Sequence, residues 1–132
     1  MLTRILRKRF NYEAEVVDPR GWSLRGVPVR QEKFNSDLAT YYDLVIGLHP
    51  DEALPAVVEA AFVRPAVIVP CCNFFDRTRR LGRDELLSAI ERRLVDGRIP
   101  VERQTLDFEG PFNIALVTDP NCGQTAGGEL GP

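Results

Sequence analysis

Cysteine, histidine and long apolar runs are all scarce in this sequence. Its three cysteines include the adjacent pair Cys71 and Cys72, and neighbouring cysteines rarely bridge each other, so a disulfide framework of the secreted kind is not expected. No apolar run approaches the roughly 20 residues that a membrane-spanning helix needs. The start, MLTRILRKRF, lacks the apolar segment and cleavage site of a signal peptide. We therefore expect a cytoplasmic protein without a membrane partner.

The overall composition is that of a globular protein, with 44% hydrophobic and 27% charged residues in a chain of 132, a length that suits one domain. A formal net charge of −2 gives no general attraction to nucleic acid, so any phosphate contact must come from local basic clusters. Each cluster either meets phosphate or is a solvated surface. There are two such clusters: Arg4, Arg7, Lys8 and Arg9; and Arg77, Arg79, Arg80 and Arg83.

Apolar periodicity divides the chain into alternating helices and strands. It predicts an N-terminal helix over 2–10, short strands near 14–18 and 27–31, buried strands within 42–50 and 66–70, helices over 51–62 and 85–95 (the last capped by Asp84), and strands at 101–108 and 112–119. Alternation of this kind favours a mostly parallel sheet with helices on both faces. The last two strands, joined by a short turn, predict an antiparallel hairpin. We expect one α/β domain over residues 1–119 and a disordered tail over 120–132.

Three loops of the predicted sheet should meet at one edge. They follow Asp18, Leu48 and Val69, and right-handed crossovers place the loops after successive parallel strands on the same side. Open α/β sheets bind their ligands at this edge. The candidate site therefore lies there.

The residues in these loops carry a resemblance to a known family. The segments YDLVIGLHPDEA, AVIVPCCNFF and LDFEGPFNIALV resemble, in this order, a class I S-adenosylmethionine-dependent methyltransferase-like family with GLHPDEA, PCC and FEG motifs. Its members include uncharacterised proteins and relatives of RNA methyltransferases. The resemblance covers Ala14 to Asp119, and its specific part is GLHPDEA together with the downstream PCC. It implies a Rossmann-like methyltransferase sheet and a role in RNA modification, with RNA meeting the second basic cluster.

The resemblance also implies roles for residues at the predicted edge. Asp18 would hold the ribose of S-adenosylmethionine, and Phe34 would border its adenine. Leu48 and His49 would lie beside the methionine moiety, and His49 with Asp51 would face the methyl acceptor. The substrate pocket would be lined by Pro70, Cys71, Cys72 and Asn73.

One part of the family pattern is missing. The family's first strand and its Gly-x-Gly loop should precede the first helix, because that loop lets the backbone approach the cofactor. This chain starts inside that helix, so the resemblance describes an N-terminally truncated domain, incomplete or inactive by itself. The absent strand is central and pairs with the strands of Asp18 and Val45. Without it, the unpaired edges of these two strands would pair with a second copy of the chain or with a partner chain. The alternative function is therefore a non-catalytic binding or scaffold domain.

Taken without the resemblance, the candidate residues keep other interpretations. His49 is either a general base or a strand-end histidine whose nitrogens are satisfied locally. Cys71 and Cys72 are zinc ligands with His49, redox-sensitive thiols, or small packing residues, although adjacent cysteines seldom turn both sulfurs to one ion. We therefore expect no metal. Asp51 equally suits a helix N-terminus, and Trp22 and Phe34 equally suit an aromatic core.

Overall fold

The computed structural model describes residues 2–20, 25–108, 110 and 113–121. They belong to two units, Met1–Phe34 and Asn35–Pro132. The predicted stacking residue Trp22 and most of the predicted tail, residues 122–132, lie outside the described residues.

The first unit contains a helix and a small parallel sheet. Helix α1 (Leu2–Arg9) forms where the apolar spacing predicted it, and none of its side chains is buried. Strand β1 (Val16–Val17) pairs in parallel with β2 (Val29–Arg30), since Val16 N donates to Pro28 O over 2.9 Å. Both predicted strands are therefore confirmed, although each is only two residues long.

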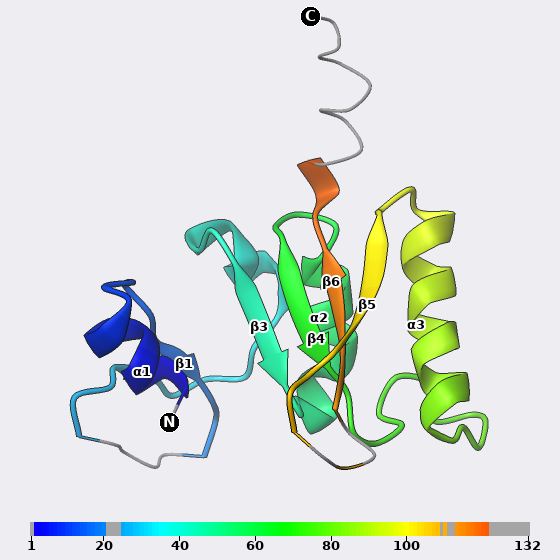
Figure 1. The fold of residues 1–132 in the computed structure, drawn as a ribbon, viewed down its shortest axis with the longest axis horizontal. Coiled ribbons are helices and arrows are strands. Elements are labelled where there is room, and N and C mark those ends of the chain that lie inside the picture. The colour runs from blue at the N-terminus through cyan, green and yellow to red at the C-terminus, as the bar shows by residue number, and fades with distance from the viewer. Residues whose placement is uncertain (1, 21–24, 109, 111–112, 122–132) are drawn as a thin grey trace, which may run out of the picture. The chain divides into compact units, whose positions relative to one another are not determined.

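The second unit holds a four-stranded sheet in the order β3-β4-β6-β5 (Figure 1). Strands β3 and β4 are parallel, but β6 is antiparallel to both β4 and β5. The predicted α/β class and terminal hairpin are confirmed, whereas the mostly parallel sheet is wrong because this sheet is mostly antiparallel. The reason is connectivity. The crossover between β3 and β4 makes them parallel, and the hairpin of β5 and β6 then inserts β6 beside β4 in the antiparallel sense. The bounds are β3 (Val45–Leu48), β4 (Ala66–Val69), β5 (Val101–Thr105) and β6 (Ile114–Thr118).

Two helical segments connect these strands, and both were predicted. After β3 the chain forms a 3-10 turn, η2 (Asp51–Ala53), and then α2 (Leu54–Ala60). Helix α3 (Arg83–Asp96) follows β4. Its N-cap is Gly82 rather than the predicted Asp84, because the carboxylate of Glu85, one turn into the helix, accepts from Gly82 N over 3.0 Å and so fixes an earlier start.

A further 3-10 helix, η1 (Ser36–Tyr41), was not predicted. It begins where Asn35 Oδ1 accepts from Asp37 N over 2.9 Å, a local side-chain turn that apolar periodicity does not report. It packs against α2, and Arg64, which follows that helix, donates from Nε to Tyr42 O over 2.8 Å.

Helices α2 and α3 contact the sheet on the same face. The ladder aligns Val45, Ala66, Thr118 and Val101 in one row, so alternate residues along each strand, including Gly47 and Arg103, share their face. A Cβ at Gly47 would meet Val57 of α2, and Arg103 Nη2 donates to Glu91 Oε1 of α3 over 2.8 Å. Within this unit the helices thus cover one face rather than two. The largest fully buried side chains include Leu54, Ile68, Leu87, Ile90, Leu94 and Leu116.

The opposite face of β3 carries exposed apolar side chains. Leu44, Ile46 and Leu48 are 48%, 37% and 50% exposed. The amides of Val45 and His49 bond toward β4, to Pro65 O and Val69 O over 3.0 and 2.9 Å. Because N–H groups alternate in direction along a strand, those of the exposed residues point to the other edge, where no described strand of this unit pairs with β3. None of the described helices has the length and apolarity to span a membrane.

Candidate functional site

The carboxyl ends of β3 and β4 lie side by side because the two strands are parallel neighbours. His49 N donates to Val69 O over 2.9 Å and closes the ladder there. His49 and Asp51 then adopt left-handed backbone conformations, with φ of 49° and 51°. Such conformations are uncommon for non-glycine residues and concentrate at functional sites. This double bend turns the chain sharply and brings Asp51 to the residues that follow β4.

Asp51 and Cys71 meet across the two strand ends. Cys71 Sγ donates to Asp51 Oδ1 over 3.5 Å, within the usual range for a thiol donor. Burial, followed by hydrogen bonds to Cys72 and Asp51, raises the pKa of Cys71 to about 12. The thiol therefore stays protonated at neutral pH, and Cys71 is a hydrogen-bond donor rather than a nucleophile. Its zinc, redox and packing interpretations stay predictions.

The other predicted residues of this edge differ in exposure. His49 and Cys72 are exposed, Leu48 is half exposed, and Pro70 is buried. The structure therefore brings His49, Asp51 and the cysteines together at one edge, with Pro70 buried beneath the surface there. Their assignment to a substrate pocket stays a prediction.

Asn73 holds a loop together. Its Nδ2 donates to Asp76 O over 2.7 Å and to Arg79 O over 2.9 Å, and its Oδ1 accepts from Asp76 N over 2.9 Å. The amide is therefore occupied by backbone groups of its own loop. This leaves Asn73 a structural residue in the present conformation.

Asp76 is a residue that the sequence analysis missed. Its Oδ1 accepts from the amide and the hydroxyl of Thr78, and its Oδ2 accepts from Arg79 Nε over 2.8 Å. These bonds, the hydroxyl of Thr78 first, lower the pKa of Asp76 to about 2. The spacing Asn73, Asp76, Thr78 is the signal that could have revealed this loop, since Asn and Asp side chains commonly cap turns two residues ahead.

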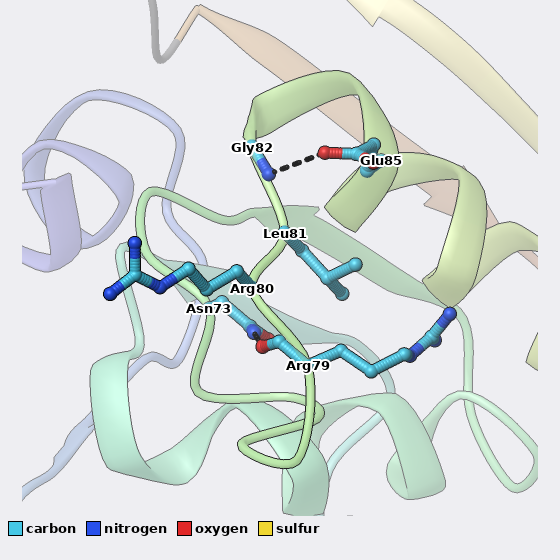
Figure 2. A pocket seen from close by; sticks show the side chains of 6 residues that line it. All are labelled: Asn73, Arg79, Arg80, Leu81, Gly82 and Glu85. Carbon is cyan, nitrogen blue, oxygen red and sulfur yellow. Dashed lines mark hydrogen bonds between the residues drawn. The ribbon is translucent and has the colours of Figure 1, made fainter.

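A shallow pocket of about 470 Å³ lies between this loop and the start of α3 (Figure 2). Glu85 closes its upper wall through the bond to Gly82 N. Arg79 and Arg80 extend from its rim in different directions (Figure 2). The pocket is thus bordered by both signs of charge, and it shares only Asn73 with the predicted substrate pocket. The lining residues are Asn73, Arg79, Arg80, Leu81, Gly82 and Glu85.

The four arginines predicted to meet RNA are not equivalent. Arg79 is paired with Asp76, and Arg83 Nε lies 3.3 Å from Asp84 Oδ1. The guanidinium of Arg77 lies over the ring of Phe74, 4.9 Å from its centroid. In the described part of the chain, neither Arg77 nor Arg80 forms an ion pair, so these two carry the positive charge of the cluster that is not locally compensated.

Two of the four residues predicted to contact the cofactor, Asp18 and Phe34, belong to the first unit, whereas Leu48 and His49 belong to the second. Asp18 follows β1 and its side chain is 13% exposed. Its Oδ1 accepts from Arg20 N and Nε over 2.8 and 3.0 Å, and its Oδ2 accepts from Arg20 Nη2 over 2.7 Å. Phe34 is partly exposed. Their roles toward the cofactor stay predictions.

Across the described ranges, no group of three or more histidine, cysteine or acidic side chains could hold a metal ion. Comparisons of the chain with protein-family models, with curated proteins and with solved structures find no match.

Proposed function

We propose that the chain is an S-adenosylmethionine-dependent methyltransferase-like domain, directed to RNA where it is active, whose second unit carries the acceptor side. The strand arrangement is the observation that carries this proposal. In the family that the sequence resembles, the glycine-loop strand pairs with the strands of Asp18 and Val45. In the described residues β1 pairs only with β2, and β3 only with β4, so each leaves an edge for such a strand. The antiparallel strand on the far side of β4 also fits the family's terminal hairpin.

The edge after β3 and β4 offers suitable chemistry for an acceptor. Methyl transfer needs alignment of the acceptor and the removal of one proton. In this proposal His49, an exposed residue, takes that proton. Asp51, held by the thiol of Cys71, orients a donor group of the acceptor. Both residues follow the end of β3, where the backbone bends at each of them.

The described residues do not yet fit the cofactor. A ribose would need the acceptor oxygens of Asp18, and Arg20 already donates to both of them. The glycines Gly21, Gly26 and Gly47 form no Gly-x-Gly loop in the sequence. We therefore derive no chemical step through S-adenosylmethionine, and ribose binding requires Arg20 to leave the carboxylate.

Isothermal titration with S-adenosylhomocysteine, the demethylated cofactor, tests this reasoning. Arg20→Ala should bind more tightly than the native chain, because the carboxylate of Asp18 is then available. Asp18→Asn is the matched control, which removes the charge at nearly constant size and should abolish binding. If neither the native chain nor Arg20→Ala gives heat at millimolar ligand, this chain does not use the cofactor by itself.

The exposed edge of β3 favours one second candidate, a scaffold domain that pairs with a second copy of the chain. Unpaired edges with apolar side chains are templates for strand addition, and Ile46 lies on this edge with 37% exposure. We expect a dimer in sedimentation analysis and a monomer for Ile46→Lys, which places a charge at the edge. Val117→Lys is the matched control, since Val117 shares the face but lies on the internal strand β6. A monomeric native chain would exclude this candidate.

A further inference from the structure

Two adjacent cysteines follow β4, and the surroundings of their thiols differ. Cys71 is partly buried and Cys72 is exposed. The thiol of Cys71 donates to the carboxylate of Asp51 over 3.5 Å. The preceding residue, Pro70, is buried, and His49 N ties the opposing bend to Val69 O. The backbone before this dithiol and the bend opposite it are thus anchored, and the two thiols differ in exposure.

We propose that the dithiol is a modification site at which Cys72 forms a mixed disulfide with low-molecular-weight disulfides of the glutathione type, while Asp51 holds Cys71 out of the exchange. Exposure decides which sulfur reacts, because thiol–disulfide exchange needs an approach in line with the disulfide. The surface position gives Cys72 this approach. Cys71 would have to break its bond to Asp51 and leave a partly buried position. The inference is independent of the methyltransferase proposal.

The exchange is balanced without a further oxidant. The thiolate of Cys72 attacks one sulfur of glutathione disulfide, the disulfide bond breaks, and a new bond joins Cys72 to one glutathione. The second glutathione leaves as a thiolate and takes up the proton that Cys72 lost. The sulfur of Cys72 is oxidised, and the departing glutathione sulfur is reduced.

The adduct should persist because its neighbour is a poor resolving thiol. The pKa of Cys71 is raised to about 12, by burial first and then by Cys72 and Asp51. The thiolate fraction of Cys71 at pH 8 is therefore well below that of an unperturbed cysteine, and the higher nucleophilicity of a basic thiolate offsets only part of this difference. Resolution by Cys71 is therefore slow. A ring between adjacent cysteines would add strain to this barrier.

Intact-mass spectrometry of the full chain carrying Cys122→Ser tests the proposal. This substitution removes the third cysteine, which lies outside the described residues. Incubation with glutathione disulfide at pH 8 should add one glutathionyl group per chain, and peptide mapping should find it on Cys72. Absence of an adduct, addition at Cys71, or a mass loss of two hydrogens from an internal disulfide would each overturn the proposal.

Three further substitutions in the Cys122→Ser background separate the two thiols. Cys72→Ser should remain unmodified over the same time, and Cys71→Ser should react as fast as its parent. Asp51→Asn suits the left-handed backbone and removes the charge, so it should make the adduct resolve faster and yield some internal disulfide. An adduct that resolves equally fast in Asp51→Asn and in its parent would refute the role given to Asp51. Far-UV circular dichroism confirms that each variant is folded.

Discussion

Replacement of Gly47 by alanine should destabilise the second unit by overpacking. Gly47 lies on the covered face of β3, and an added Cβ would stand 2.8 and 3.3 Å from the two terminal carbons of Val57. Favourable contacts between carbons need about 3.5–4.0 Å. Val57 is 4% exposed, and valine in a helix has one preferred rotamer, so the strain reaches the backbone of α2. We expect a cost of about 1–3 kcal/mol, which lowers the melting temperature by about 4–12 °C.

A double-mutant cycle with Val57→Ala isolates this contact. Val57→Ala alone destabilises through the lost burial of its methyl groups and the cavity left behind. It also removes both Val57 carbons that would lie too close to the new Cβ. Gly47→Ala should therefore cost little in the Val57→Ala background and about 1–3 kcal/mol in the native one. Urea denaturation followed by circular dichroism measures all four proteins. An equal cost of Gly47→Ala in both backgrounds would refute the close approach of β3 and α2.

Two further predictions concern the loop before α3. The pKa of Asp76 is lowered from 3.8 to about 2. Its hydrogen bonds therefore stabilise the loop fully above about pH 4, and this stabilisation is lost as the pH falls through about 2. Carbon NMR of the carboxyl group should show a single titration near pH 2, and a midpoint near 4 would contradict the hydrogen-bond network. In the RNA proposal, Arg77→Ala with Arg80→Ala should reduce the salt dependence of single-stranded RNA binding by about 1.4 in slope. Arg79→Ala should change the slope less, since Arg79 is paired with Asp76, and fluorescence anisotropy over a salt series compares the two.

Local residue patterns predicted much of the candidate site. Parallel strands that end at Leu48 and Val69 place the following residues at one edge, and the structure finds His49, Asp51 and Cys71 together there. The pattern could not report that Cys71 is a protonated donor, since this depends on burial and on a partner 20 residues away. Nor could it show that Arg20 donates hydrogen bonds to both carboxylate oxygens of Asp18.

The sequence by itself determined where the helices and strands lie, because periodicity and β-branched runs act within a few residues. It therefore predicted the β3–α2–β4 crossover, the helix before β5 and the final hairpin. Only the tertiary structure decided how the strands are ordered. The side of β4 on which β6 inserts depends on long-range packing of buried faces. The local sequences of apolar strands are too similar to specify which strands become neighbours. The mostly antiparallel character of the sheet follows from that choice.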